Sequence, residues 1–280
     1  MLKLRDGVIE LYKKVANSIP PDVEDAIKGF LPREDNPAAK ESLSRMLDTI
    51  RSSRQASRPV CLDTGIPTFK IKIPKGLSHT EIRNTVREAT VIATQKVPLN
   101  QNAVDILTGQ NSGDNTGLGF PVIYLEETAE DTLTIDLMLR GSECENYGLT
   151  YALPSEEPDA GRDLEGVRKS VLHCVQKAQG KGCPPYSIGV GIGAARDQVT
   201  VLSKHQLFRK LTDTSEYPVI AALENRLMED INRTGIGPMG LGGRTTTLGV
   251  KIGINHRSTE SFIVDVSLCC WANRRGRLIW

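Results

Sequence analysis

The chain lacks the features that mark membrane proteins and nucleic-acid-binding proteins. No apolar run in its 280 residues approaches the roughly 18 residues that a membrane-spanning helix requires. The 35 basic and 34 acidic residues leave a net charge of +1, so the composition offers no electrostatic surface for nucleic acid or anionic lipid. Residues 1–15 mix charged with apolar positions, which is typical of an amphipathic helix and not of a signal peptide. We therefore expect a cytoplasmic globular protein that binds neither membranes nor nucleic acid.

Internal repeats, low-complexity tracts and a regular alternation of strands with helices are also missing. The periodic segments predict a mixed α/β (α+β) fold, a single large domain with a helical N-terminal part. We divide the chain into an N-terminal helical segment, residues 1–57, and a region with the candidate site, residues 58–280, and residues 51–58 are expected to be a polar connector. Expected helices cover residues 6–16, 21 onward, 37–53, 78–95, 163–179, 197–211 and 218–229, and expected strands cover residues 68–73, 121–125, 132–139, 187–193, 247–254, 262–268 and 277–280.

Irregular segments rich in glycine and asparagine separate these elements. They span residues 97–119, 141–148, 180–185 and 235–247. Such loops in a compact domain usually carry function. Neither the G-V-G-I-G run nor G-I-G-P-M-G-L-G-G has the spacing of a nucleotide-binding motif. The loops are therefore candidates for binding another kind of ligand.

Three of the six cysteines stand in segments that fix the direction of the thiol. Cys61 precedes a glycine turn in R-P-V-C-L-D-T-G, Cys183 lies between a glycine and two prolines in K-G-C-P-P, and Cys270 precedes Trp271. Their spacing is unlike that of a zinc ribbon or a ferredoxin, so a shared metal would be assembled from distant parts of the chain. A reducing compartment disfavours disulfides. The alternative is that each cysteine is a small buried apolar residue or part of a surface turn.

Charged groups accompany these cysteines. Asp63 follows Cys61 by two residues, and Arg274 and Arg275 follow Cys270 closely. Guanidinium groups bind carboxylates through two parallel hydrogen bonds, so an acidic ligand is favoured. The alternative is a surface turn and two solvated arginines.

One histidine is well placed for acid–base chemistry. His256 lies in the irregular I-N-H-R-S-T segment between two expected strands. We expect His79 and His205 on helix surfaces, and His173 in a packing role inside a helix.

Five motifs, taken in order, resemble those of the α subunits of class I fumarate hydratases and L-tartrate dehydratases. They are C-L-D-T-G, then P-L-N-Q-N-A-V with N-S-G-D-N-T-G, then G-C-P-P with G-V-G-I-G, then G-I-G-P-M-G-L-G-G-R-T-T, and last C-C-W-A-N-R-R. The resemblance runs from about residue 58 to residue 277. It implies a hydro-lyase that adds or removes water across the double bond of a small dicarboxylate such as fumarate.

The resemblance also implies a 4Fe–4S cluster held by Cys61, Cys183 and Cys270. Cys270 is preferred to Cys269 because the motif cysteine directly precedes Trp271. In this family the fourth iron has no protein ligand and acts as a Lewis acid on the substrate. The cysteines not expected to be ligands are Cys144, Cys174 and Cys269.

An acid–base pair is implied as well. The family's aspartate after the cluster cysteine falls on Asp63, and a histidine ahead of C-W-A contributes to proton handling. Counting back from Cys270 without gaps puts Ser258 at the position of this histidine. A two-residue insertion aligns H-R-S-T instead and selects His256, which we prefer.

Two positions depart from the family pattern. Leu62 stands where the family has glutamine, and Asn100 stands where an arginine grips a substrate carboxylate. Both positions, with Arg274, are expected to contact the substrate. Losing a charged bidentate contact costs about 2–4 kcal/mol of binding if nothing replaces it. The departures predict a related 2-hydroxy diacid, or a less charged acid, as the substrate.

The resemblance implies a partner, because the family's substrate site needs a second half. We expect a separate β subunit and an α2β2 assembly. An alternative is a catalytically degenerate relative that retains the cluster for structure or sensing. A zinc protein that uses the same cysteines is less favoured, because structural zinc sites are closed by four ligands.

Overall fold

The computed structural model describes all residues, 1–280, and they form two compact units. Unit 1 comprises Met1–Pro20, Thr49–Ser142 and Arg274–Trp280, and unit 2 comprises Pro21–Asp48 and Glu143–Asn273. Each unit contains one four-stranded mixed sheet, and helices open the chain. The mixed α/β class with a helical N-terminal part is therefore confirmed. The boundary predicted between residues 57 and 58 separates sequence segments and falls inside unit 1.

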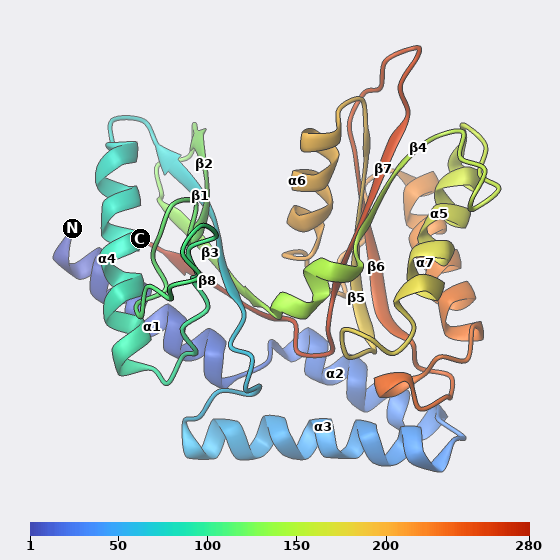
Figure 1. Ribbon diagram of the computed structural model, residues 1–280, viewed down its shortest axis with the longest axis horizontal. Helices are drawn as coiled ribbons and strands as arrows, with labels where there is room; N and C mark the ends of the chain where they lie inside the picture. Colours follow the sequence, from blue (N-terminus) through green and yellow to red (C-terminus); the bar gives the residue numbers. More distant parts are fainter. The chain divides into compact units, whose positions relative to one another are not determined.

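In unit 1 the sheet has the strand order β2-β1-β3-β8 (Figure 1). Strand β1 is parallel to β2 and antiparallel to β3, and β3 is antiparallel to β8. Helices α1 and α4 pack against each other and share an apolar cluster with β1 and β3. The elements are α1 (Leu2–Asn17), β1 (Ile66–Pro74), α4 (His79–Lys96), β2 (Val122–Thr128), β3 (Thr134–Arg140) and β8 (Arg274–Ile279).

The local sequence explains the elements of unit 1 that were predicted best. Phe69, Ile71 and Ile73 alternate along β1 and are fully buried, as expected for a strand with one face toward the core. Ser78 caps α4, and its side chain accepts a hydrogen bond from the Glu81 backbone nitrogen at 3.3 Å. This confirms the predicted N-terminal cap.

In unit 2 the sheet has the strand order β4-β7-β5-β6. Strand β5 is parallel to β6 and antiparallel to β7, which also pairs antiparallel with β4. The elements are α2 (Pro21–Phe30), β4 (Leu149–Ala152), α5 (Leu164–Ala178), β5 (Tyr186–Gly193), α6 (Arg196–Gln206), α7 (Pro218–Arg233), β6 (Thr247–Ile254) and β7 (Ile263–Cys269); α3 spans Pro37–Ala56, and short 3-10 helices cover Leu31–Arg33, Ser142–Tyr147 and Pro238–Gly240.

The glycines of G-V-G-I-G serve close packing between a helix and the sheet. A Cβ atom added to Gly189 would lie 2.1 Å from the Ser203 carbonyl oxygen, and one added to Gly191 would lie 2.2 Å from the Val199 carbonyl oxygen. Helix α6 therefore rests directly on the backbone of β5. This supports the earlier exclusion of a nucleotide-binding role for the run.

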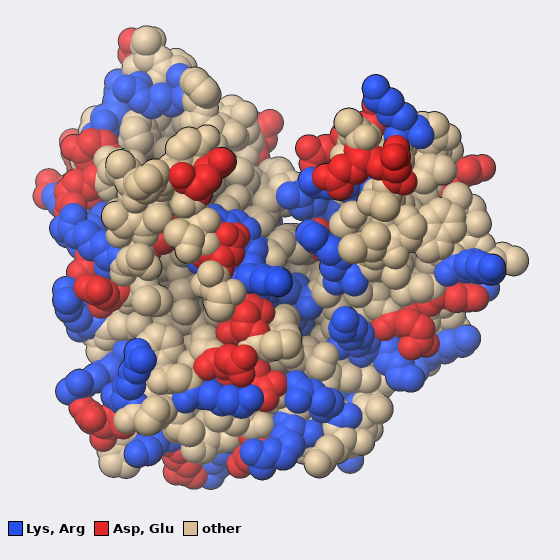
Figure 2. All heavy atoms as spheres, turned by 180° about the vertical axis from the view of Figure 1, so that it is seen from behind, with Lys and Arg blue, Asp and Glu red and all other residues tan.

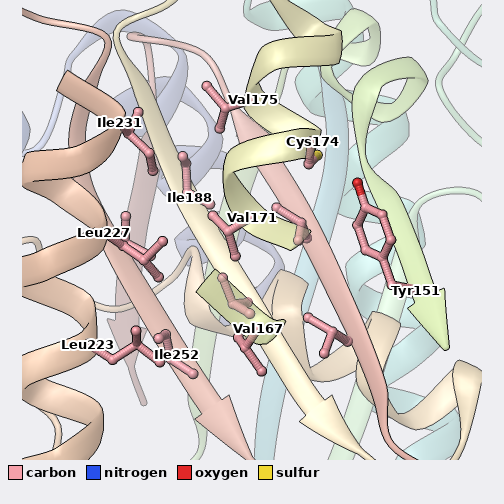
Figure 3. Close-up of a cluster of buried hydrophobic side chains, with 14 of the residues drawn as sticks. Tyr151, Val167, Val171, Cys174, Val175, Ile188, Leu223, Leu227, Ile231 and Ile252 are labelled. Atoms are coloured by element: carbon pink, nitrogen blue, oxygen red, sulfur yellow. The ribbon is translucent and has the colours of Figure 1, made fainter. Parts of the chain in front are cut away.

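The opposite face of β5 lies in the main apolar cluster of unit 2. Because side chains alternate along a strand, Ile188 points away from α6 and packs with residues of α5 and α7 (Figure 3). Labelled members of this cluster are Tyr151, Val167, Val171, Cys174, Val175, Ile188, Leu223, Leu227, Ile231 and Ile252.

Some element boundaries differ from the predictions. Helix α3 continues to Ala56, so the prediction of a connector over residues 51–58 is wrong for most of its length. Arginine, serine and glutamine on an exposed helix face do not interrupt a helix, and the polar composition was misleading there. Strand β4 was not predicted, because four residues are too few for a visible alternation. Helix α6 ends at Gln206 and not near residue 211.

Figure 2 shows lysine and arginine side chains interspersed with aspartate and glutamate on the face it displays. None of the helices combines the length and the apolar character that crossing a membrane requires.

Candidate functional site

The Cys183 turn and the Cys270 segment lie together in unit 2. The Trp271 backbone nitrogen donates a hydrogen bond to the Cys183 carbonyl oxygen at 3.0 Å. The reason is the antiparallel pairing of β5 with β7, in which Ser187 is opposite Cys269 at the end of the sheet. Cys183 is half-buried and Cys270 is buried. The structure therefore brings two of the three predicted cluster ligands into one neighbourhood.

Cys183 adopts an unusual backbone conformation. Its φ is +59°, in the left-handed region that costs a residue with a Cβ roughly 1–2 kcal/mol. Strain of this kind persists only where the surroundings fix the backbone, and it concentrates at functional sites. The turn therefore holds the backbone of Cys183 in a defined conformation, and the direction of its thiol stays a prediction.

The glycine-rich loop of residues 235–247 packs on this turn. The Met239 backbone nitrogen donates to the Pro184 carbonyl oxygen at 2.8 Å. A Cβ atom added to Gly180 would lie 2.7 Å from the Gly240 Cα atom, so the two backbones touch. The loop therefore supports the segment that carries Cys183.

Glu34 fastens this loop from the helical part of unit 2. Its buried carboxylate accepts hydrogen bonds from the Arg244 backbone nitrogen at 2.9 Å and 3.0 Å, and from the Thr245 hydroxyl at 2.9 Å. It also accepts from the backbone nitrogens of Asp35 at 3.1 Å and Asn36 at 3.3 Å. Sequence reasoning missed Glu34, because no local pattern links it to a loop about 200 residues away.

Replacing Glu34 with glutamine should lower the free energy of unfolding by about 2–3 kcal/mol, because an amide nitrogen would face backbone donors. Chemical denaturation of the purified chain measures this change. The control is Glu41→Gln, whose exposed pair with Arg45 should contribute less than about 1 kcal/mol. Equal effects of the two substitutions would contradict the assignment of Glu34 as the residue that fastens the loop.

The remaining three cysteines are buried, and none of the six forms a disulfide. Cys144 lies against the Cys183 turn, with its sulfur 3.5 Å from the Gly182 carbonyl oxygen. Cys174 lies in the apolar cluster of Figure 3, where burial raises the pKa of its thiol to about 12. Cys269 is fully buried and belongs to β7, one position before Cys270.

In unit 1, the turn from Cys61 to Gly65 orients a carboxylate. The Asp63 Oδ1 atom accepts from the Gly65 backbone nitrogen at 2.8 Å, and Oδ2 accepts from the Ser142 backbone nitrogen at 2.8 Å. Gly65 is required here, because its φ is +86° and a Cβ atom would lie 2.5 Å from the Arg140 carbonyl oxygen. Asp63 is half-buried, so its carboxylate is fixed and still partly accessible.

Asparagine side chains of residues 97–119 hold the same turn. The Asn100 side-chain amide donates to the Leu62 carbonyl oxygen, and its backbone nitrogen donates to the Thr64 hydroxyl at 2.9 Å. Asn102 donates to the Gly65 carbonyl oxygen at 3.1 Å. The Leu62 side chain itself is exposed. The asparagine-rich segment thus braces the Cys61–Gly65 turn, a role that the composition alone did not reveal.

Arg274 is fully buried in unit 1 and is only partly satisfied. Its Nη2 atom donates to the Asp63 carbonyl oxygen at 2.9 Å, whereas Nε and Nη1 have no hydrogen-bond partner. Buried polar groups are nearly always paired, and an unpaired one calls for an explanation such as an absent ligand. A carboxylate oxygen is a suitable acceptor for either of these donors.

The histidines occupy varied environments. His256 and Ser258 are exposed in the segment between β6 and β7. That segment lies at the opposite end of the unit 2 sheet from Cys270, since β7 runs seven residues between them, roughly 20 Å at the rise of a strand. The structure does not bring His256 together with the Cys183 and Cys270 segments of the same chain.

The other histidines bear on the earlier expectations. His79 is exposed at the start of α4, as predicted. His173 packs edge-to-face on Tyr151, and its Nδ1 atom lies 2.8 Å from the tyrosine hydroxyl, which confirms a packing role. His205 is half-buried, so its placement on a helix surface is only partly right.

The chain is a mixed α/β protein. Two thiols lie in neighbouring loop segments of unit 2, and in unit 1 a buried guanidinium binds the carbonyl of the residue that bears a fixed carboxylate. The chain belongs to the fumarate hydratase family, because residues 5–278 match the model described as Fumarate hydratase (Fumerase).

Individual relatives support this membership. A candidate class I fumarate hydratase of Geobacillus stearothermophilus is 43% identical over 279 residues, which cover 98% of this chain and 54% of the relative. A candidate L(+)-tartrate dehydratase subunit alpha of Methanocaldococcus jannaschii is 36% identical, over 98% of this chain and 96% of the relative. The L(+)-tartrate dehydratase subunit alpha of Escherichia coli K12 is 33% identical, over 99% and 90%. The chain thus spans about half the length of the first of these relatives and most of the other two.

Proposed function

We propose that the chain is the α subunit of an iron–sulfur hydro-lyase, which adds water to, or removes it from, a small dicarboxylate of the fumarate/malate or tartrate type. The observation that carries the proposal is the contact between Cys183 and the Cys270 segment, since both cysteines stand in the motifs that resemble cluster ligands. Membership in the fumarate hydratase family supports the reaction class.

The ligands of a 4Fe–4S cluster would be Cys61, Cys183 and Cys270. The fit is supported by the soft thiolate donors and by the backbone that fixes Cys183. When bound, the cluster supplies an iron without a protein ligand, which acts as a Lewis acid toward the substrate oxygens. A zinc site is less well supported, because only three cysteines stand in such motifs.

The chain's own polar groups would bind the acid and transfer a proton. Either the Nε or the Nη1 atom of Arg274 would donate to a substrate carboxylate oxygen and thereby gain a partner. Asp63 would accept the proton from carbon, since each of its oxygens accepts one backbone hydrogen bond and retains a free lone pair. Arg274 also holds the Asp63 carbonyl, so binding and proton transfer would be positioned by one side chain.

His256 remains a candidate acid–base residue under a specific condition. It is exposed and lies roughly 20 Å along the sheet from Cys270, so it would serve the site of a second α subunit in an α2β2 assembly. Ser258, the residue selected by gap-free counting, lies in the same exposed segment. Either choice therefore requires a second copy of the chain.

The partner would be a β subunit that completes the substrate site. The Geobacillus stearothermophilus relative is nearly twice as long as the matched region, and relatives of this chain's length are described as alpha subunits. We therefore propose a β subunit, the kind of partner that these names imply, as the source of the second half of the site.

A catalytically degenerate relative is the alternative. One observation favours it: the Asn100 side chain bonds to the Leu62 carbonyl, so no charged group of that loop faces a substrate at this position. The fixed Asp63 carboxylate and the partly unpaired Arg274 favour turnover. We therefore retain the enzymatic proposal as the first.

Anaerobic purification of the α/β complex tests the proposal. We expect visible absorption with iron and sulfide in equal amounts, and turnover of at least one substrate in a panel of fumarate and 2-hydroxy diacids. The chain without its partner should show little or no activity. Turnover without iron would refute the cluster, full activity of the 280-residue chain alone would refute the split site, and a full cluster without turnover of any acid would select the degenerate alternative.

A further inference from the structure

Four large aliphatic side chains are distinguished by their exposure, and all four lie in unit 1. Leu62 is 91% exposed, Ile106 97% and Leu107 94%, and Leu118 is fully exposed, whereas no other large apolar side chain of the chain exceeds 67%. We call these four residues the apolar loop face. Its members come from two loops only, the Cys61–Gly65 turn and the segment of residues 97–119.

Hydrogen bonds join these two loops. Asn100 donates to the Leu62 carbonyl oxygen, and Asn102 donates to the Gly65 carbonyl oxygen at 3.1 Å. The Asn115 side chain donates to the Asn100 carbonyl oxygen at 2.8 Å. The apolar loop face is therefore attached to the same turn that carries Cys61 and Asp63.

A short hairpin presents the most exposed pair. Val104 pairs with Asn111 across the hairpin. At its tip the Asp105 Oδ1 atom accepts from the Leu107 nitrogen at 2.9 Å, and from the nitrogen and hydroxyl of Thr108 at 2.8 Å and 3.0 Å. The tip is thus ordered by polar contacts, while Ile106 and Leu107 remain in solvent. Exposed apolar groups that are gathered together and rimmed by polar residues often mark a surface that a partner covers.

We propose that the apolar loop face docks the β subunit, with the Ile106–Leu107 tip inserted into an apolar groove of that subunit. The inference rests on the proposed function for the existence of a β subunit. Two observations favour the β subunit as the partner that covers this face. The Geobacillus stearothermophilus relative contains a further part outside the matched region, which covers 54% of it. Leu62 also lies between Cys61 and Asp63, so a partner that completes their site must reach this face.

The test compares the affinity of two variants for the β polypeptide of the same organism. Ile106→Ser with Leu107→Ser removes both side chains and leaves the backbone, Asp105 and Thr108 contacts of the tip intact. We expect the Kd to rise about 10- to 100-fold, as for residues that dominate an interface. The control is Leu2→Ser with Val219→Ser, which removes two exposed aliphatic groups elsewhere and should leave the Kd unchanged. Leu118→Ser provides a second, independent probe of the face.

Each outcome decides the proposal. An unchanged Kd in both the hairpin variant and Leu118→Ser overturns it. Sedimentation of the hairpin variant without the β subunit gives another check. If this variant loses a self-association that the wild-type chain shows, and its β binding is unchanged, the face belongs to a second α copy and the proposal is overturned. Binding is measured without substrate, so it is independent of turnover. If β binds through the hairpin but the complex holds no cluster and converts no acid, the docking stands and the proposed function falls.

Discussion

Replacing Cys183 with serine is expected to reduce the iron content of the α/β complex at least tenfold and to abolish turnover. Serine is nearly isosteric with cysteine, but its hydroxyl is a poor iron ligand beside two thiolates. The backbone contacts of the turn, from Trp271 and Met239, do not involve the side chain. The free energy of unfolding should therefore change by less than about 1 kcal/mol. Iron and sulfide counts after anaerobic purification measure the effect.

Cys144→Ser is the matched control for this experiment. The Cys144 sulfur lies 3.5 Å from the Gly182 carbonyl oxygen, so it is close to the Cys183 turn without being in a ligand motif. We expect it to retain full iron content, as should Cys174→Ser and Cys269→Ser. Iron loss in the Cys269 variant with normal iron in a Cys270 variant would show that the wrong member of the pair was selected. Normal iron in Cys183→Ser would refute the proposed ligand set.

The sequence predicted the parts of the fold that depend on local patterns. Strand β6 has the predicted bounds, Thr247–Ile254, because its apolar run ends at a polar segment. Ser78 and Pro218 marked helix starts through capping and through the fixed φ of proline. The Cys183 turn was recognisable for the same reason, since glycine and two prolines restrict the backbone there.

Local sequence patterns could not predict the contacts between distant segments. Glu34 binds a loop about 200 residues later through backbone donors, and no periodicity encodes this pairing. The bracing role of Asn100 was likewise hidden, because asparagine in a loop is equally compatible with a turn. The separation of His256 from Cys270, by contrast, could have been predicted from the sequence. A predicted strand of seven residues separates it from Cys270, and a strand of that length spans roughly 20 Å.

Apart from the loss of the cluster, the largest effect of a substitution is expected on the activity toward fumarate and L-malate. Asn100 offers only a neutral amide, and its nitrogen already bonds to the Leu62 carbonyl oxygen. An arginine at this position would add a charged bidentate contact to a substrate carboxylate, worth about 2–4 kcal/mol. We therefore expect the wild-type complex to hydrate fumarate and dehydrate L-malate poorly.

Asn100→Arg with Leu62→Gln should raise kcat/KM for fumarate and L-malate by roughly 30- to 900-fold, the range that corresponds to about 2–4 kcal/mol. Glutamine is close to leucine in size, so it should fit at this position of the complex without strain. The Asn100 backbone bond to Thr64 does not depend on the side chain, and only the amide bond to Leu62 is lost, at about 0.5–1.5 kcal/mol. Steady-state kinetics of the anaerobic α/β complex measure the gain.

The control for this prediction separates charge from geometry. Asn100→Lys with Leu62→Gln adds a positive charge without the planar fork of a guanidinium, so it should recover only part of the gain. An equal gain with lysine would show that net charge, not bidentate binding, limits the wild type. Wild-type hydration of fumarate at about 10⁴ M⁻¹s⁻¹ or faster would contradict the specificity argument itself. In that case the buried guanidinium of Arg274, with its unpaired Nε and Nη1 atoms, would suffice to hold the carboxylate, and the chain would act as an ordinary fumarase subunit.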